Sequence, residues 1–446
     1  MNVFFVSLGC DKNLVDSEYM LGILRSRGYD FTDDEAEADV IVVNSCCFIG
    51  DAKEESINTI LEMAQYRTAD DERCRALVVA GCLAQRYADE IRTEIPEVDA
   101  IVGTTAYDTI ADVIDRVLGG EHVRELESID RLVLPDAERI VTTGGYYSYL
   151  KIAEGCDKHC TYCIIPKLRG RYRSVPMERL VKEAKELADR GVKELILVAQ
   201  ETTVYGVDLY GKKSLPQLLK ELCLIEGIRW IRIQYCYPEE ITDELIEVIK
   251  EEDKICNYLD MPIQHASDRI LKLMGRRTDR AQLTSIINRL RKEIPDIALR
   301  TTLITGFPGE DEQDMDVLLD FVEETEFERL GVFAYSAEEG TAASVMPDQT
   351  DEDIREARRD EVMQLQQEIA YRHALDMVGR KLDVMVEGRL VDEETYVSRT
   401  YMDAPGVDGL LFINTEQNLM SGEIVKVRVT GANEYDLIGE LCDESA

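Results

Sequence analysis

Three cysteines in the middle of the chain have a spacing typical of metal ligands. Cys156, Cys160 and Cys163 form a C-x₃-C-x₂-C motif directly after a predicted strand, and we call them the barrel thiols. Soft thiolates suit iron–sulfur clusters, and three of them on a cluster of four irons leave one iron open for a substrate or cosubstrate. Two alternatives stay open: a zinc site with His159 as fourth ligand, and buried thiols that bind nothing.

Three further cysteines are far apart in the chain but occupy equivalent places. Cys10, Cys46 and Cys82, which we call the N-terminal thiols, each follow a predicted strand by one to three residues. The carboxyl ends of parallel strands meet at one sheet edge, where ligands bind. These thiols are therefore predicted to be neighbours and to hold a second cluster with an open iron, unless their placement is chance. Cys47 competes with Cys46, although its side chain should point the other way.

The segments around these cysteines predict an α/β fold. In residues 1–120, short apolar runs alternate with amphipathic stretches, which predicts an N-terminal doubly wound parallel sheet. The expected strands are 2–7, 40–44, 76–80 and 100–102, and the expected helices are 14–27, 52–66, 85–95 and 106–118. Residues 121–145 are expected to be a linker.

A strand-then-helix rhythm repeats six times within residues 146–350. It predicts a central partial (β/α)6 barrel with its chemistry at the carboxyl ends of the strands. The expected strands are 148–153, 194–199, 230–234, 258–263, 298–304 and 331–335. Residues 351–375 are expected to form a connecting helix, and residues 376–446 a C-terminal small antiparallel β-barrel.

Composition places the chain among soluble globular proteins, with 45% hydrophobic and 31% charged residues. No apolar run approaches the ~20 residues that span a bilayer, so no membrane partner is expected. The apolar start of the chain is too short for a signal peptide and lacks a basic leading segment, which predicts a cytoplasmic protein. In that compartment the twelve cysteines are not expected to form disulfides, and the clustered ones are expected to serve metal binding or catalysis.

The chain is strongly acidic, with 89 Asp and Glu against 51 Lys and Arg and a net charge of −38. Such an excess repels nucleic acid, so transfer RNA is not an expected partner. One interpretation is a basic protein partner. The other is acidity that serves only solubility.

The barrel thiols closely resemble the motif of the radical S-adenosylmethionine superfamily. The resemblance implies that the open iron binds the amino and carboxylate groups of S-adenosylmethionine. An electron from the cluster then cleaves it to a 5′-deoxyadenosyl radical. Residues 302–310, with Gly306, resemble the glycine turn beside the adenosine, and Gln200 and Glu201 lie where the superfamily binds the methionine amino group. Tyr162, inside the motif, is a further predicted cofactor contact; a plain turn and a loop carboxylate remain alternatives.

The N-terminal thiols lie in segments that resemble the methylthiotransferases, namely residues 8–13, 44–49 and 81–87. Members of that family insert a methylthio group into an unactivated C–H bond of a macromolecule. The resemblance covers almost the whole chain. It implies two [4Fe-4S] clusters, an N-terminal domain with its own cluster, a radical barrel and a small β-barrel called TRAM.

Four segments are similar to the RimO-type branch, which acts on an aspartate of small-subunit ribosomal protein S-twelve: residues 11–18, 149–155, 261–267 and 333–341. The MiaB-type branch, which modifies adenosine in transfer RNA, usually differs in the first and third of these. Cys47 departs from the RimO-type pattern, where glycine is common. Residues 376–446 carry 15 acidic and 6 basic residues, which suits a basic ribosomal protein.

The resemblance implies two uses of S-adenosylmethionine. One molecule methylates a sulfur at the N-terminal cluster, and another yields the radical that removes a hydrogen from the β-carbon of the aspartate. An electron donor such as flavodoxin or ferredoxin and a sulfur donor are implied partners, and no side chain is expected as general acid or base. The alternatives are a transfer-RNA adenosine methylthiotransferase and a non-catalytic iron–sulfur electron carrier, although carriers usually close each cluster with four ligands.

Overall fold

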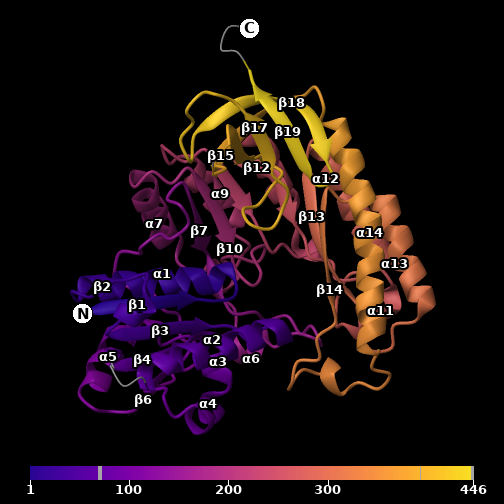
Figure 1. The fold of residues 1–446 in the computed structure, drawn as a ribbon. Coiled ribbons are helices and arrows are strands. Elements are labelled where there is room, and N and C mark those ends of the chain that lie inside the picture. Colours follow the sequence, from indigo (N-terminus) through magenta and orange to yellow (C-terminus); the bar gives the residue numbers. More distant parts are fainter. Residues whose placement is uncertain (69–72, 392, 443–446) are drawn as a thin grey trace.

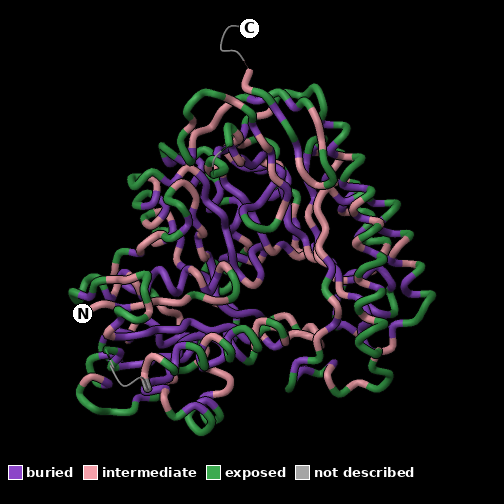
Figure 2. The backbone as a smooth tube through the Cα atoms, viewed as in Figure 1, coloured by how far each residue is buried: buried purple, intermediate pink, exposed green. Residues whose placement is uncertain are grey.

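The computed structural model describes residues 1–68, 73–391 and 393–442. An N-terminal sheet lies at the bottom of Figure 1, a second sheet in the middle, and a closed barrel at the top. Figure 2 shows buried backbone running through the middle of each part, with exposed backbone mostly on the outer helices and loops. Among the described residues, no helix is long and apolar enough to cross a membrane.

The N-terminal part is a six-stranded parallel sheet in the order β2-β1-β3-β4-β5-β6. This confirms the predicted doubly wound sheet. Its strands are β1 (Asn2–Ser7), β2 (Asp30–Phe31), β3 (Val40–Ser45), β4 (Ala76–Ala80), β5 (Ala100–Val102) and β6 (Val123–Glu125). Every residue of β3 and β4 is buried, because helices cover both faces of a parallel sheet.

Helices α1 (Asp11–Ser26) and α5 (Ile110–Leu118) cover one face of this sheet. The other face is covered by α2 (Gly50–Thr68), α3 (Gly81–Arg86) and α4 (Ala88–Glu94). The single helix predicted over residues 85–95 is wrong, because the backbone leaves helical geometry at Tyr87 (φ −122°, ψ 35°). The segment predicted as a linker supplies β6, which pairs with β5.

The central part is a six-stranded sheet in the order β14-β13-β12-β11-β10-β7, with every pair parallel. This confirms the six-stranded parallel arrangement of a partial barrel. Its strands are β7 (Tyr147–Lys151), β10 (Glu194–Val198), β11 (Trp230–Ile233), β12 (Ile255–Asp260), β13 (Ala298–Thr305) and β14 (Arg329–Ala334). The strand predicted to run to residue 263 ends at Asp260, and the apolar residues after it include Pro262, which has no backbone N–H for a ladder.

Helices join successive strands of the central sheet. They are α6 (Ile165–Arg169), α7 (Met177–Asp189), α8 (Val207–Tyr210), α9 (Leu215–Cys223), α10 (Asp243–Glu251), α11 (Asp268–Leu273), α12 (Arg280–Glu293) and α13 (Glu312–Thr325). A small antiparallel ribbon, β8 (Ala153–Glu154) with β9 (Arg173–Ser174), encloses the loop of residues 155–172, which contains the barrel thiols and α6. Single 3₁₀ turns occur at η1 (Glu35–Glu37), η2 (Tyr107–Thr109), η3 (Pro238–Glu240) and η4 (Ala343–Val345).

The C-terminal part begins with the long helix α14 (Glu352–Asp376), seen on the right of Figure 1. A closed barrel follows in the order β15-β16-β17-β19-β18. Its strands are β15 (Lys381–Arg389), β16 (Thr395–Arg399), β17 (Leu411–Asn414), β18 (Ile424–Asn433) and β19 (Asp436–Leu441). The antiparallel prediction is wrong for one pair: β17 and β19 run parallel, because five strands in a closed ring cannot all alternate in direction.

A fully buried ion network fixes this barrel on the central sheet. Glu194 of β10 accepts from Arg232 Nε at 2.8 Å and from Arg399 Nη2 of β16 at 2.7 Å. Arg232 also donates to the carbonyl of Tyr401, at 2.6 Å. Burial works against ionising Glu194, but Arg399 and Arg232 hold its pKa below the usual value.

Replacing Arg399 with methionine should therefore loosen the C-terminal barrel. Glu194 would lose one of its two buried partners, and breaking such a pair costs about 3–5 kcal/mol. We expect the free energy of opening at the amides of β16, measured by hydrogen exchange, to fall by about that amount. Lys182→Ala, which removes an exposed pair with Glu186, is the control and should leave β16 unchanged. Equal protection of β16 in Arg399→Met and the parent would contradict this role.

Candidate active site

The N-terminal thiols all lie at the carboxyl edge of the N-terminal sheet. Cys10 caps α1 after β1, Cys46 follows β3, and Cys82 lies in the first turn of α3 after β4. β1 and β3 are neighbours at the point where the strand order reverses, which is where doubly wound sheets bind ligands. The three thiols are in electrostatic range of one another.

Burial, together with the neighbouring Cys82 and Cys10 thiols, raises the pKa of the Cys46 thiol to about 12. Metal binding to such thiols must displace protons, so loading would depend on pH.

The turn that carries Cys10 packs directly against Cys46 and leaves no room for a side chain at Gly9. Gly9 has φ +89°, and a Cβ there would lie 2.5 Å from Cys46 Cβ and 2.8 Å from its Sγ. Only glycine fits this position without a shift of the neighbouring backbone. Cys47 packs in the same apolar cluster as Cys82, where its thiol lies in electrostatic range of Cys82 and beside Arg86.

The barrel thiols lie in the loop enclosed by β8 and β9. Cys156 is buried, and its Sγ accepts from the backbone N–H of Lys158 at 3.4 Å. The N–H of Cys163 donates to the Cys160 carbonyl at 3.1 Å, so the motif ends in a tight turn. Burial is the main cause that raises the pKa of Cys156 and of Cys163 to about 12, and the neighbouring thiols contribute to the rise at Cys163.

The donor set in each place fits a cluster. Within the described ranges, no three His, Cys, Asp or Glu side chains lie close enough together to hold a single metal ion. Three thiolates on a four-iron cluster bind different irons and therefore stand farther apart than the ligands of one ion. His159, the fourth ligand of the zinc alternative, has an exposed side chain.

Glu201 offers a buried acceptor oxygen that lies within ion-pair distance of Lys158 but has no hydrogen-bond partner among the described residues. The carboxylate is 1% exposed, its Oε1 accepts from the N–H of Thr203 at 3.0 Å, and its Oε2 has no hydrogen-bond partner. Lys158 Nζ lies 3.8 Å from Oε2. Burial raises the pKa of Glu201 to about 7. An orphaned carboxylate oxygen beside the barrel thiols fits a cationic group such as an amine.

The other predicted cofactor contacts have varied surroundings. Tyr162 lies with its hydroxyl beside the Cys160 thiol. Gln200 donates to Glu154 Oε1 at 2.8 Å and leaves its own oxygen without a partner. The N–H of Gly306 donates to Glu310 Oε1 at 2.8 Å.

Gly306 also meets a neighbour that the sequence did not indicate. A Cβ at Gly306 would collide with the side chain of Arg355 on α14. The glycine at this turn is therefore required by the close approach of α14, in addition to any approach of a cofactor.

Both thiol sets adjoin the end of the same strand, β11. Tyr235 Oη donates to Asp11 Oδ1 at 3.3 Å, next to Cys10, whereas Tyr237 Oη lies 3.5 Å from Cys160 Sγ. Tyr235 has the left-handed φ of 60°, stabilised by a hydrogen bond from its N–H to Asp260 at 3.0 Å. Strained residues of this kind cluster at functional sites. The sequence prediction missed both tyrosines, although two aromatic residues directly after a barrel strand were a usable signal.

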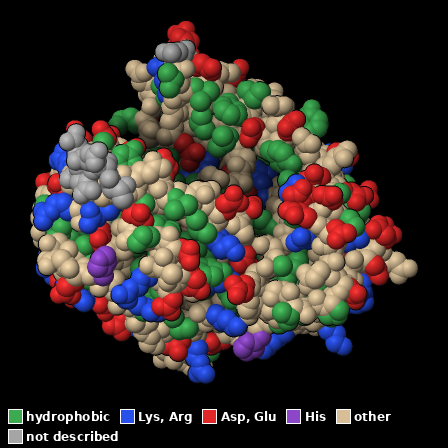
Figure 3. All heavy atoms as spheres, turned by 60° about the horizontal axis from the view of Figure 1, so that its bottom comes forward, with side chains coloured by type: hydrophobic (Ala, Val, Ile, Leu, Met, Phe, Trp, Pro, Cys, Tyr) green, Lys and Arg blue, Asp and Glu red, His purple; other side chains and the backbone are tan. Residues whose placement is uncertain are grey.

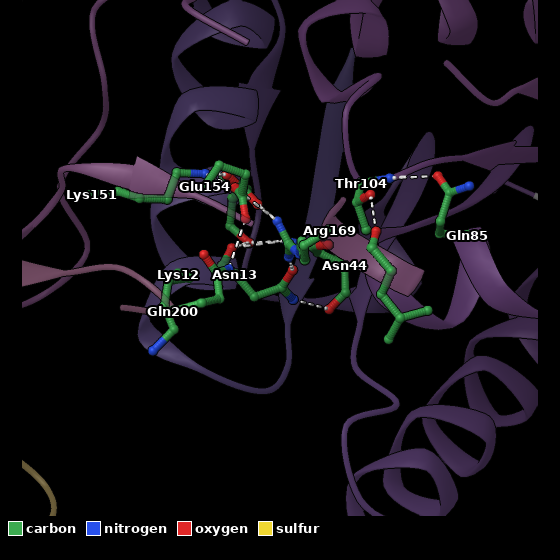
Figure 4. Close-up of polar contacts among 12 residues, drawn as sticks. Lys12, Asn13, Asn44, Gln85, Thr104, Lys151, Glu154, Arg169 and Gln200 are labelled. Carbon is green, nitrogen blue, oxygen red and sulfur yellow. Dashed lines mark hydrogen bonds and ion pairs between the residues drawn. The ribbon is translucent and has the colours of Figure 1, made fainter. Parts of the chain in front are cut away.

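A buried polar network joins the loop of the barrel thiols to α1, and Figure 4 shows it. Arg169, at the end of α6, donates to Asp16 Oδ2 at 2.6 Å and to Asn13 Oδ1 at 3.1 Å. Lys151 and Glu154 complete the network, with 2.8 Å between Lys151 Nζ and Glu154 Oε2. Sequence analysis missed these residues, because charged side chains on short elements show no pattern until the two parts are packed together.

The chain is similar to known proteins over each of its three parts. The chain matches the radical SAM superfamily over residues 150–322, the family described as "Uncharacterized protein family UPF0004" over residues 2–103, and the TRAM domain over residues 378–442. It is 65% identical, over 98% of this chain and 99% of the relative, to ribosomal protein uS12 methylthiotransferase RimO of Lachnoclostridium phytofermentans. The chain belongs to the RimO family. The RimO of Acetivibrio thermocellus is 51% identical over 100% of this chain and 99% of its own.

A solved structure supports the fold alone. The radical S-adenosylmethionine methyltransferase TsrM from Kitasatospora setae, with cobalamin and a [4Fe-4S] cluster bound, has a TM-score of 0.53 and 14% identity. The match covers 75% of this chain and 74% of TsrM.

The similarity to RimO proteins and the radical SAM match make this chain a radical SAM methylthiotransferase, which favours the predicted branch over the electron-carrier alternative.

Replacing Gly9 with alanine should disturb the N-terminal thiols and spare the barrel thiols. The added Cβ would press on Cys46, so we expect iron bound per chain after anaerobic reconstitution to fall by about half, as the sequence prediction of two equal [4Fe-4S] clusters implies. Gly120→Ala is a matched control: φ is also positive, at +93°, but no atom lies within 4 Å of the added Cβ. Iron content equal to the parent in Gly9→Ala would show that this close approach does not matter for binding.

Proposed function

We propose that this RimO-family enzyme adds a methylthio group to the β-carbon of an aspartate in ribosomal protein uS12, the S-twelve of the sequence prediction. The observation that carries the proposal is the full-length similarity to RimO proteins, at 65% identity for one of them. The convergence of two thiol sets on the end of β11 supports it, because the reaction needs a radical source and a sulfur source beside one substrate carbon.

The six cysteines are the proposed ligands of two [4Fe-4S] clusters. The N-terminal thiols Cys10, Cys46 and Cys82 hold one, and the barrel thiols Cys156, Cys160 and Cys163 hold the other. When bound, the barrel cluster supplies the electron that cleaves S-adenosylmethionine, and the N-terminal cluster supplies the methylthio group. Cys46 is preferred over Cys47, because its side chain lies against Gly9 in the turn that carries Cys10.

The chain's own residues bind and orient the cosubstrate. The unpartnered Oε2 of Glu201 and the unpartnered oxygen of Gln200 are proposed to accept from the methionine ammonium. Tyr162 lies beside Cys160, and the turn at Gly306 is held by Glu310. No side chain is assigned as general acid or base.

Charge supports a basic protein as substrate. The net charge of −38 includes 15 acidic and 6 basic residues in 376–446. Figure 3 shows acidic and basic side chains interspersed over the face turned toward the viewer, with a group of acidic ones to the right of a hollow. Complementary potentials would attract a basic ribosomal protein and repel transfer RNA.

The reaction also needs partners that the chain does not contain. A low-potential reductant such as flavodoxin or ferredoxin and a sulfur donor are proposed. A cytoplasmic location, where ribosomal proteins are made, follows from the proposed substrate. The proposed units are residues 1–120, 146–350 and 376–446, joined by 121–145 and 351–375.

The substrate assignment is tested by competition. Anaerobic, reconstituted enzyme would be given S-adenosylmethionine, a strong reductant, uS12 and unmodified transfer RNA together. We expect mass spectrometry to find one methylthio group on an aspartate of uS12 and none on adenosine. A gain on adenosine instead would overturn the substrate while leaving the radical chemistry in place.

The division of labour between the two thiol sets is tested by single replacements. Alanine at Cys10, Cys46 or Cys82 should abolish methylthiolation and leave reductive cleavage of S-adenosylmethionine, measured as 5′-deoxyadenosine. Alanine at Cys156, Cys160 or Cys163 should abolish both. Cys47→Ala is the control that should keep both activities; loss of methylthiolation there would transfer the ligand role to Cys47.

A further inference from the structure

Arg169 is a buried side chain that bonds to both parts of the chain that carry the proposed cluster sites. It is 2% exposed, and it belongs to the short helix that starts two residues after Cys163. Its Nη1 donates to Asp16 Oδ2 at 2.6 Å and to Glu154 Oε2 at 3.3 Å, and its Nη2 donates to Asn13 Oδ1 at 3.1 Å. The guanidinium thus binds α1 of the N-terminal sheet and β8 of the central part at once.

The same guanidinium lies beside a proposed ligand of the N-terminal cluster. Its helix α6 packs against α3, which carries Cys82, and the guanidinium is in electrostatic range of the Cys82 and Cys10 thiols. Three of its five N–H groups go to Asp16, Glu154 and Asn13, so two remain for the sulfur. Hydrogen bonds to cluster sulfurs raise reduction potentials, because they stabilise the added negative charge.

The backbone around Arg169 is fixed from both sides. Leu168 is buried in the apolar cluster of the N-terminal sheet, and its carbonyl accepts from Thr104 Oγ1 at 2.9 Å. Figure 4 shows the Thr104 contact on one side of Arg169 and the contacts to Asn13 and Glu154 on the other. Glu154, in turn, accepts from Gln200, a proposed contact of S-adenosylmethionine.

We propose that Arg169 is a positioning residue for the N-terminal cluster, supporting the Cys82 thiolate and fixing the barrel-thiol loop against the same sheet edge. This inference rests on the proposed cluster at Cys10, Cys46 and Cys82. A lysine cannot replace the arginine, because its single ammonium group cannot reach Asp16, Glu154, Asn13 and Cys82 together. The planar guanidinium with its several N–H donors, and not only its positive charge, is therefore required.

The test uses Arg169→Lys and Arg169→Gln in the full chain with alanine at Cys156, Cys160 and Cys163, so that only the N-terminal cluster loads. The reduction potential would be titrated by electron paramagnetic resonance. We expect both variants to titrate at a more negative potential than the Arg169 parent, with Arg169→Gln shifted further. In the enzyme with all its cysteines, we expect the ratio of 5′-deoxyadenosine to methylthiolated product to rise several-fold in Arg169→Lys.

A second buried arginine at this interface provides the control. Arg139 is 4% exposed and pairs with Glu18 of α1 at 3.1 Å and Glu183 of α7 at 2.9 Å. Neither carboxylate is a proposed cluster ligand. Arg139→Lys should lower thermal stability as Arg169→Lys does, but leave the potential unchanged.

Three outcomes would overturn the inference. An unchanged potential in Arg169→Lys would show that the side chain has only a structural role, and so would an equal shift in Arg139→Lys. If the triple-alanine parent binds no iron, the proposed N-terminal cluster itself fails, and the inference fails with it. Because the titration needs no substrate, its result is independent of whether uS12 or another molecule is modified.

Discussion

The arrangement of this enzyme depends on one packing constraint: the carboxyl edge of the N-terminal sheet must face the carboxyl end of the central sheet. Parallel strands collect their ligand-binding loops at one edge, and here two such edges are joined into one interface. Arg169, Asp16 and Glu154 hold that interface together in a place that excludes water. Buried charges are tolerated there because each has a partner of opposite sign.

The same constraint explains why the thiols are placed on turns instead of inside strands. Cys10, Cys46 and Cys82 follow β1, β3 and β4, so each belongs to a different crossover but to one edge. The barrel thiols use another solution, a single loop enclosed by the β8–β9 ribbon. As proposed ligands, the N-terminal thiols would require a folded sheet before a cluster could bind, whereas the barrel motif brings its three thiols together locally.

Much of this organisation was readable from the chain itself. The strands β1, β3, β4 and β5 were predictable because buried parallel strands form short continuous apolar runs. The break at Tyr87 was not predictable, because it depends on a local turn. The early end of β12 was not predictable either, because the apolar residues after it are buried without continuing the strand. Arg169 was missed because its partners Asp16 and Asn13 lie more than a hundred residues away in the chain. Tyr235 and Tyr237 were missed although their place directly after a barrel strand was a usable signal. The cysteine positions were predictable, but their ligand roles remain predictions.

The helix α14 has a consequence for how far the chain length can vary. Near its start, Arg355 fills the space beside Gly306, and Arg358 donates to Glu310 Oε1 at 3.0 Å. Near its end, Arg372 pairs with Glu326 at 2.7 Å, and the helix packs against β18 of the C-terminal barrel. One inserted residue would rotate everything beyond it by about 100° around the helix axis. The helix therefore fixes the distance between the Gly306 turn and the C-terminal barrel, and it tolerates a change of sequence far better than a change of length.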